Sequence, residues 1–204
     1  AGHYGMREQA GKRWLAKGET LLLPTEAMKL AGEHNYANAL AALALGEAAG
    51  IPLDGMLAAL REFTGLAHRT QWVRERNRVN WYNDSKGTNV GATLAALAGL
   101  PGKTVLIAGG QGKGADFTPL RAVAAQKARA VILIGEDRAK IADVLDGVVL
   151  HLYAQSMEDA VELAAELAQP GDNVLLSPAC ASFDMFKGFA HRGEVFSEAV
   201  RRLP

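Results

Sequence analysis

The sequence contains a single cysteine, Cys180, among 204 residues, so disulfide bonds and cysteine-rich zinc sites within the chain are excluded. Long apolar runs are missing too, since no stretch approaches the roughly 18 consecutive apolar residues of a membrane-spanning helix. Charge of one sign is also lacking: 22 basic residues balance 22 acidic ones, so no net field attracts nucleic acid or anionic lipid. These absences predict a cytoplasmic protein that binds neither membranes nor nucleic acids.

The residues that are present are typical of an ordinary globular protein. Hydrophobic residues make up 49% of the chain and charged residues 22%, a balance that supports a packed core and a charged surface. A length of 204 residues corresponds to about one to one and a half average domains.

The first third of the sequence predicts two helices after an irregular start. Residues 1–25 contain scattered glycines and one short apolar run at 21–23, so we expect a loop with at most one strand. Residues 35–49 are rich in alanine and leucine and stop at a glycine, which predicts a helix. A second, shorter helix is expected over residues 53–63.

After residue 65 the pattern changes to strands that alternate with helices. Two short aromatic and β-branched runs, Gln71–Glu75 and Arg78–Tyr82, predict a hairpin. Continuously apolar strands and helices follow, which is typical of a parallel sheet covered on both faces. We expect the strands at residues 104–108, 130–134, 148–153 and 173–176, and the helices at 89–98, 119–127, 138–145, 157–168 and toward Arg202. The predicted fold class is α/β, with a domain boundary near Gly65.

Ligands bind parallel α/β sheets at the carboxyl ends of the strands, so the segments after the strands are candidate sites. One of them, Gly109–Asp116, has four glycines around Lys113. Glycine lets the backbone come close to a ligand and present N–H groups, while Lys113 supplies a positive charge for a carboxylate or a phosphate. The alternative is a flexible strand-to-helix turn with a solvated lysine.

This glycine segment is not a P-loop, because Ile107 stands where GxxxxGK[ST] requires its first glycine. Residues 110–115 do match GxGxxG/A, the dinucleotide-binding pattern. That pattern requires a helix that begins inside the glycine run, whereas Pro119, with Thr118 as its cap, predicts a later start. The later start disfavours a dinucleotide-binding oxidoreductase domain, which remains an alternative.

A second candidate segment, Asn83–Asn89, follows the hairpin and leads into a helix. Asp84 suits ribose hydroxyls or a cation, Lys86 suits phosphate, and Thr88 with the N–H groups after it suits an anion at a helix N-terminus. Helix capping and turn formation alone would also favour these residue types.

A third candidate segment, Leu176–Asp184, follows the last strand and contains two serines. Small residues and hydroxyls at a strand end suit a ligand pocket. Neither Ser177 nor Ser182 is expected to be a nucleophile, because the GxSxG elbow is missing. Cys180 is expected to be a small buried apolar side chain.

Two polar pairs lie ahead of the hairpin. Asn35 and Asn38 are roughly one helical turn apart, so their amides share a face that could read a nucleobase edge; alternatively Asn35 caps the helix. Arg69, beside His68, could clamp a phosphate, or the pair is simply solvated. The histidines show no metal-ligand spacing, so no complete metal site is expected in the chain.

Taken in order along the chain, these segments resemble the Mur ligases of bacterial peptidoglycan synthesis. The matching segments are Gly32–Asn38, Gly65–Arg69, Asn83–Asn89, Gly109–Phe117 and Leu176–Gly193, of which the last is the most specific. The resemblance runs from about Met28 to the C-terminus. It is strongest to the family members that add D-glutamate to UDP-N-acetylmuramoyl-L-alanine.

The resemblance implies a domain arrangement. The family has an N-terminal UDP-binding domain, a central ATPase domain with the P-loop, and a C-terminal Rossmann-like domain. Residues 1–66 would then be a mostly helical remnant of the ATPase domain, and residues 67–204 a Rossmann-like ligase domain with a mostly parallel sheet. The chain would be a fragment without the UDP-binding domain and the P-loop, and inactive by itself.

The resemblance also implies a reaction and its ligands. ATP phosphorylates the substrate carboxylate, and the amino group of D-glutamate attacks the acyl phosphate, with release of ADP and phosphate. The partners would be the small molecules ATP, D-glutamate and UDP-N-acetylmuramoyl-L-alanine, in a monomeric enzyme. The magnesium ligands would lie upstream of this chain.

Residue roles follow only at positions that match the family's motifs, and no complete catalytic set is implied in this chain. The implied ATP-binding residues are Asn35, Asn38, His68, Arg69, Asp84 and Lys86. The implied D-glutamate-binding residues are Thr88, Lys113, Ser182 and Phe189. Gln111 stands where relatives can carry an acidic residue, so its neutral side chain supplies no charge there. Without the family, a non-catalytic nucleotide- or anion-binding α/β module is the other alternative.

Overall fold

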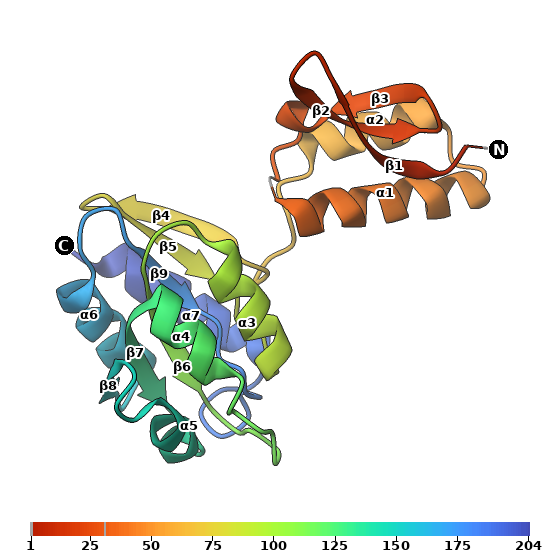
Figure 1. The fold of residues 1–204 in the computed structure, drawn as a ribbon. Coiled ribbons are helices and arrows are strands. Elements are labelled where there is room, and N and C mark those ends of the chain that lie inside the picture. Colours follow the sequence, from red (N-terminus) through yellow and green to blue (C-terminus); the bar gives the residue numbers. More distant parts are fainter. Residues whose placement is uncertain (1, 31) are drawn as a thin grey trace. The chain divides into compact units, whose positions relative to one another are not determined.

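The computed structural model describes residues 2–30 and 32–204, and the chain divides into two compact units, residues 1–65 and 66–204. Figure 1 shows the elements of both units.

The first unit combines a small antiparallel sheet with two helices (Figure 1). Its elements are β1 (Tyr4–Gln9), β2 (Lys12–Lys17), β3 (Thr20–Pro24), the 3-10 helix η1 (Thr25–Ala27), α1 (Glu33–Ala48) and α2 (Leu53–Glu62). The strands pair in the order β1-β2-β3. Leu15 and Leu23 of the sheet pack with Leu43 and Leu57 of the helices in one buried cluster.

The expectation of a loop with at most one strand over residues 1–25 is wrong, because three strands occupy this segment. The scattered glycines mark tight hairpin turns: Gly11, with φ +72°, lies in the turn between β1 and β2. A second turn at residues 18–19 joins β2 to β3. The description of this region as mostly helical therefore applies only to residues 33–62.

The second unit is built around one six-stranded sheet. Its elements are β4 (Gln71–Arg76), β5 (Val79–Asn83), α3 (Val90–Gly99), β6 (Thr104–Gly109), α4 (Leu120–Lys127), β7 (Ala128–Ile134), α5 (Arg138–Leu145), β8 (Leu150–Tyr153), α6 (Met157–Leu167), β9 (Asn173–Leu176) and α7 (Phe189–Arg202). The strand order is β4-β5-β9-β6-β7-β8, with β4 antiparallel to β5 and the other strands parallel. The predicted hairpin and mostly parallel α/β sheet are confirmed, with small differences at the element ends.

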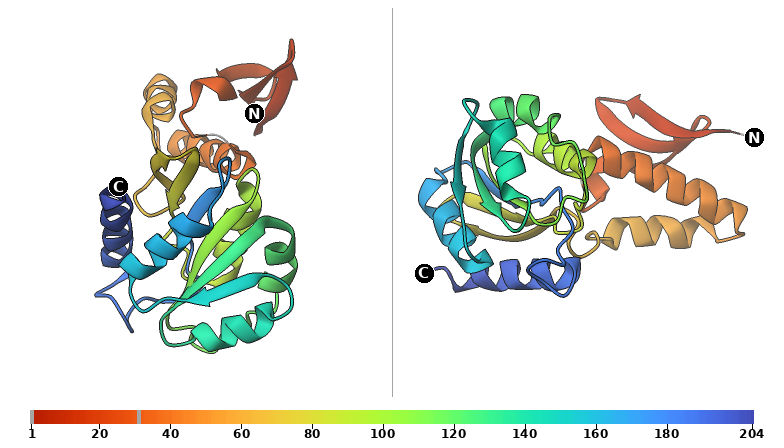
Figure 2. Two further views of the ribbon diagram at one scale, coloured as in Figure 1. Left: turned by 90° about the vertical axis from the view of Figure 1, so that its left-hand side faces the viewer. Right: turned by 90° about the horizontal axis from the view of Figure 1, so that it is seen from below.

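Helices cover both faces of this sheet, as Figure 2 shows. On one face Ile107 and Ile132 pack with Phe196 of α7 and with α6. On the other face Leu106 and Val131 pack with α3, α4 and α5. Successive side chains of β6 and β7 therefore enter opposite cores, which explains why these strands are apolar without alternation. Each large side chain buried in this way stabilises the fold by about 1.5–3 kcal/mol.

The strand order identifies the position at which open α/β sheets usually bind ligands, here called the central crevice. From β6 the chain steps outward through β7 and β8, and it then returns through α6 to β9 on the other side of β6. Such a reversal leaves room at the carboxyl ends of the two central strands. The loops that follow β6 and β9 therefore flank this position. Among the described residues, no helix is long and apolar enough to cross a membrane.

Candidate functional site

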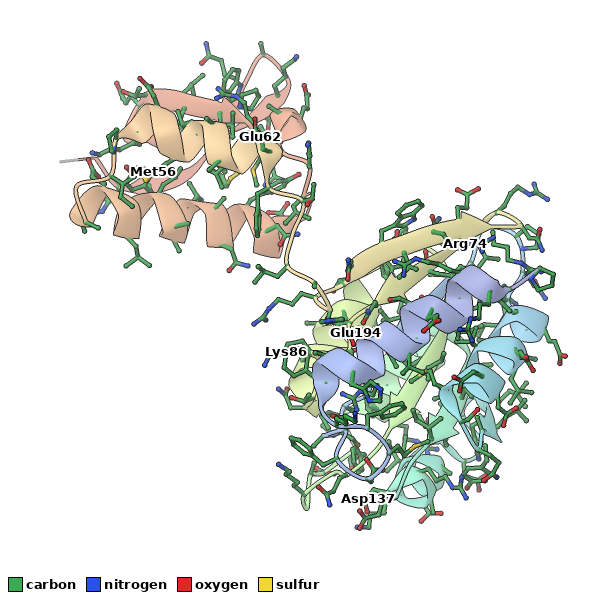
Figure 3. The ribbon with its side chains drawn as sticks, turned by 180° about the vertical axis from the view of Figure 1, so that it is seen from behind. Met56, Glu62, Arg74, Lys86, Asp137 and Glu194 are labelled. Atoms are coloured by element: carbon green, nitrogen blue, oxygen red, sulfur yellow. The ribbon has the colours of Figure 1, made fainter. Side chains whose placement is uncertain are left out.

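The candidate site of the second unit is formed by three loops, one turn and the first turn of a helix. The loops follow β5, β6 and β9, and they are joined by the turn at residues 66–70 and the first turn of α7. Figure 3 shows Lys86, in the loop after β5, beside the beginning of α7.

Asp84 is buried at the base of this site, with 7% of its surface exposed. One carboxylate oxygen accepts hydrogen bonds from the Thr70 backbone N–H at 3.0 Å and from the Thr70 hydroxyl at 3.3 Å. The other accepts the Ser177 hydroxyl at 2.7 Å, and the Thr93 hydroxyl lies 3.1 Å from that of Ser177. Burial raises the pKa of Asp84 above its usual value, although these hydrogen bonds and the charge of Arg69 act in the opposite direction.

His68 is held from two sides. Its Nδ1 lies 3.1 Å from Nδ2 of the fully buried Asn83. Its backbone carbonyl accepts the Lys86 N–H at 3.0 Å, in a left-handed conformation with φ +64°. The turn that carries His68 and Arg69 is thus fastened to the loop after β5, and it belongs to the second unit.

Lys86 and Phe189 lie in direct contact, although the resemblance implies different ligands for them. The Lys86 ammonium lies 4.0 Å from the centre of the Phe189 ring, a cation–π arrangement. The His68 ring meets the same ring edge-on at 6.0 Å. The Ser85 hydroxyl donates to the Phe189 carbonyl at 2.7 Å and so fixes the start of α7 against this loop.

Arg192 was missed by the sequence analysis, although it connects the loops of the site. The fully buried guanidinium donates to the Ser85 hydroxyl at 3.0 Å, to the Ser85 carbonyl at 2.9 Å and to the Cys180 carbonyl at 3.1 Å. Burial lowers the pKa of Arg192 to about 10. The sequence signal is its spacing from Phe196 and Val200, which places Arg192 on the buried stripe of α7.

Cys180 behaves as expected, because it is fully buried. Burial raises the pKa of its thiol to about 12, so the thiol stays protonated and unreactive.

The glycine segment after β6 was expected to present its backbone N–H groups to a ligand, but three of them are bonded within the chain. The N–H groups of Gly109, Gln111 and Gly112 donate to Pro178 O at 2.8 Å, Ala181 O at 3.0 Å and Asp137 Oδ2 at 2.7 Å. The Ala181 N–H returns a bond to Gln111 O at 2.9 Å, which closes an isolated antiparallel bridge. Internal bonds satisfy these donors, so the segment is a braced support for Lys113.

The helix after this segment begins late, at Leu120, with Pro119 at its N-cap position. The expected late start is therefore confirmed, and it argues against dinucleotide binding because no helix opens inside the glycine run. Thr118 does not cap α4, which has no side-chain cap; its own N–H donates instead to Asp116 Oδ1 at 2.9 Å.

Lys113 and Ser182 stand on the two loops that flank the central crevice. Lys113 is exposed in a left-handed conformation, with φ +52°. Its ammonium lies 5.9 Å from the ring centre of Phe183, which is 68% exposed. Ser182, next to Phe183, is 2% exposed, so only a small part of this residue is open to a ligand.

Capping explains part of the segment after β5. Asn89 caps α3, because its side chain accepts the Ala92 N–H at 2.9 Å. Thr88, one residue earlier, is exposed and does not serve as this cap. Thr88 therefore lies just ahead of the N-terminus of α3, where an anion is favoured.

Asn35 and Asn38 lie in the first unit, on α1. The helix begins at Glu33 with Gly32 at its N-cap position and no side-chain cap, so the alternative that Asn35 caps it is wrong. Both asparagines line an open groove of about 420 Å³. The other lining residues are mostly apolar and include Met28, Leu43, Met56 (labelled in Figure 3) and Leu60. An apolar groove with two amides fits a flat heterocyclic base.

Metal-ligating side chains do not form a cluster in the part of the chain that the structure describes. Within residues 2–30 and 32–204, no group of three histidine, cysteine or acidic side chains lies close enough to hold a metal ion. The lysine, arginine and hydroxyl groups of the site suit organic ligands that carry anionic groups.

Known proteins are similar to this chain in sequence and in fold. The family profile described as Mur ligase, glutamate ligase domain matches residues 68–180. UDP-N-acetylmuramoylalanine–D-glutamate ligase of Pseudomonas putida is 57% identical over 204 residues, covering 98% of this chain and 45% of the relative. The ligase of the same name from Legionella pneumophila is 54% identical, covering 99% of this chain and 46% of the relative. This chain therefore spans about half the length of the curated relatives it matches.

Solved structures show the same fold. The folylpolyglutamate synthase/dihydrofolate synthase of Yersinia pestis aligns with a TM-score of 0.70 at 18% identity, over 96% of this chain and 45% of that one. UDP-N-acetylmuramate-alanine ligase of Thermotoga maritima aligns with a TM-score of 0.67 at 17% identity, over 98% and 46%. Because the profile covers more than half of this sequence, and curated ligases share more than half of its residues along nearly its whole length, the chain belongs to the Mur ligase family.

Proposed function

We propose that the chain is the C-terminal part of an ATP-dependent ligase that adds D-glutamate to UDP-N-acetylmuramoyl-L-alanine in cytoplasmic peptidoglycan synthesis. Residues 1–66 form the end of its ATPase domain and residues 67–204 its glutamate ligase domain. The observation that carries the proposal is the 57% identity, over 98% of this chain, to a relative named for this reaction. The geometry of the loops supports it.

The chemistry requires activation, because a carboxylate is a poor electrophile. Transfer of the ATP γ-phosphoryl group gives an acyl phosphate and ADP. The amino group of D-glutamate then attacks the acyl carbon, loses a proton and expels inorganic phosphate, which leaves the amide. The protein contributes by holding the two substrates in line and by stabilising their negative charges.

D-Glutamate is a dicarboxylate, and the loops around the central crevice suit it. Lys113 offers an exposed positive charge on a segment that internal hydrogen bonds brace. Ser182 and Thr88 add hydroxyls, and Thr88 stands at a helix N-terminus. We assign these residues, with Phe189, to D-glutamate, since charge-assisted hydrogen bonds are the strong contacts for a carboxylate.

Six residues are assigned to ATP, as the family resemblance implies. Asn35 and Asn38 line the apolar groove of the first unit, which fits adenine. In the second unit Lys86 and Arg69 are exposed cations for phosphate oxygens, His68 lies beside them, and Asp84 is the acceptor proposed for the ribose. The P-loop and the magnesium ligands are proposed to lie in the upstream part of the complete protein.

The test compares the complete protein with this chain. The complete ligase is expected to release phosphate from ATP only when both D-glutamate and UDP-N-acetylmuramoyl-L-alanine are present, and to act as a monomer. This chain alone is expected to show no such turnover, because the γ-phosphate site is not in it. Phosphate release that ignores D-glutamate would refute the proposed substrate, and turnover by this chain at the rate of the complete protein would refute the fragment interpretation.

A further inference from the structure

The side-chain amide of Asn83 has only one orientation that satisfies its surroundings. One of its terminal atoms lies 3.1 Å from the backbone N–H of Ser85, which can only donate. The other lies 2.9 Å from the carbonyl of Gly193, which can only accept. The first atom must therefore be Oδ1 and the second Nδ2, so the usual ambiguity of an amide is resolved by two backbone groups.

This orientation determines which atom of the Asn83 amide faces the His68 ring. Nδ2 of Asn83 lies 3.1 Å from Nδ1 of His68, and an amide nitrogen donates but does not accept. A proton on Nδ1 would face a group that does not accept, whereas an unprotonated Nδ1 can accept one of the two amide N–H groups, which Gly193 O and Ser197 Oγ also approach. In a neutral imidazole the other ring nitrogen, Nε2, then carries the proton.

Helix α7 is shaped for this contact. A Cβ atom at position 193 would overlap the His68 ring and press on Asn83, so only glycine lets the imidazole reach the amide. Asn83 is fully buried, whereas His68 is half-buried. Among the described residues, His68 Nε2 has no hydrogen-bond partner. The structure thus buries one ring nitrogen in a fixed contact and leaves the other to a ligand.

We propose that Asn83 is a positioning residue that fixes His68 as the Nε2-protonated tautomer, so that Nε2–H donates a hydrogen bond to an anionic oxygen of the substrate. The ammonium of Lys86 and the His68 ring contact the same Phe189 ring, which places a positive charge near the proposed acceptor. Only the identity of that acceptor, a phosphate or a carboxylate oxygen, rests on the proposed function.

The tautomer can be measured on this chain without any ligand. Nitrogen-15 NMR at about pH 8 is expected to show a protonated Nε2 and an unprotonated Nδ1 for His68. A His68→Gln variant assigns the signals, because one histidine set disappears. A proton on Nδ1 in the unmodified chain would overturn the proposal, whatever the variants do.

Two substitutions test the role of Asn83. Asn83→Asp places an acceptor against Nδ1 and is expected to draw a proton to that nitrogen. Ser197→Ala is the matched control, because it removes a hydroxyl 3.0 Å from Nδ2 but leaves the contact with His68. If Asn83→Asp folds and His68 keeps its Nε2 proton alone, Asn83 does not fix the tautomer. If that variant does not fold, the tautomer of the unmodified chain decides.

Kinetics of the complete ligase test the donor. The amide nitrogen of glutamine can take the place of Nε2, whereas that of asparagine falls near Nδ1. We expect His68→Asn to lose roughly tenfold or more in kcat/KM relative to His68→Gln, as for a hydrogen bond to a charged group. Equal losses would overturn the donor role. A complete protein without D-glutamate-dependent phosphate release would instead refute the proposed function, and the tautomer result would still stand.

Discussion

The hydroxyl of Ser177 donates a 2.7 Å hydrogen bond to the carboxylate of Asp84, and both residues are buried. The contact joins the loop after β9 to the loop after β5, and Thr70 holds the other oxygen of the same carboxylate. Hydrogen bonds satisfy this group, yet removal from water still penalises its charge. The carboxylate is therefore expected to reduce stability while it serves ligand binding.

This cost predicts that Asp84→Asn stabilises the chain near neutral pH. The folded-state pKa of Asp84 is raised, so folding favours the protonated carboxyl, and stability is lost as pH rises through that pKa. A neutral amide avoids the loss. We expect the variant to melt a few degrees higher than the unmodified chain near pH 7.5 and at the same temperature near pH 3, where both side chains are neutral.

Thermal unfolding followed by circular dichroism over this pH range measures the effect. Asp143→Asn, at an exposed position of α5, is the control and is expected to leave the difference between the two pH values unchanged. A lower melting temperature for Asp84→Asn near pH 7.5 would show that the carboxylate's hydrogen bonds outweigh its desolvation.

Arg192→Met is expected to destabilise the chain by about 3 kcal/mol. The substitution keeps apolar bulk on the buried stripe of α7 but leaves the Ser85 hydroxyl, the Ser85 carbonyl and the Cys180 carbonyl without their donor. Each buried polar group that loses its partner costs about 1–3 kcal/mol, and removal of a buried charge offsets part of the sum. Urea unfolding measures the change at constant m-value.

The control for this variant is Arg202→Met on the same helix. Arg202 is exposed and paired with the exposed Glu198 one turn away, so its loss is expected to leave the free energy of unfolding nearly unchanged. Equal effects at the two positions would mean that the hydrogen bonds of Arg192 add nothing to stability.

The sequence predicted the second unit because its signals are local. Short β-branched apolar runs such as Thr104–Ala108 favour buried strands, and helices between such strands favour parallel connections. The prediction for residues 1–25 was wrong because the three strands there are short and the turns between them are only two residues long. Scattered glycines such as Gly11 indicate either a loop or a hairpin turn, and only pairing between strands distinguishes these.

The sequence identified the segments that form the candidate site, but it did not show which of their residues contact one another. Glycine density after β6 indicated close approach of the backbone, yet its nearest partners are Ala181 and Asp137 of this chain. Arg192 escaped notice because an arginine in an amphipathic helix is usually exposed. Neither Asn83 beside His68 nor Lys86 against Phe189 can be read from spacing. The first pair meets when the turn at residues 66–70 packs against the end of β5, and the second when α7 packs against the loop after β5.

Gly110→Ala is expected to destabilise the chain strongly. Gly110 has φ +124°, and a Cβ there would overlap the Ala181 carbonyl, which belongs to the bridge between the two crevice loops. The strain alone is worth about 1–3 kcal/mol, before the clash is added. Gly99→Ala, in α3 with open space around it, is the control and is expected to be neutral or slightly stabilising. Similar melting temperatures for the two variants would show that the crevice loops adapt freely.

Lys113→Ala tests the D-glutamate assignment in the complete ligase. Lys113 is exposed, and its ammonium lies 5.9 Å from the ring centre of Phe183, so truncation disturbs little of the fold. We expect the KM for D-glutamate to rise about tenfold to a hundredfold, as for loss of a charge-assisted hydrogen bond, while the KM for ATP stays nearly constant.

Lys103→Ala is the matched control for Lys113→Ala. Lys103 lies just before β6, at the end of the strand away from Lys113, and its ammonium donates to Gln126 O at 3.0 Å. The Lys103→Ala substitution therefore removes the same charge from a position outside the crevice. Initial rates at varied D-glutamate and fixed saturating ATP separate the two variants, because only loss of a carboxylate contact raises the KM of one substrate selectively. An unchanged D-glutamate KM in Lys113→Ala, or an equal rise in both variants, would remove Lys113 from the D-glutamate site and leave general electrostatic attraction as the explanation.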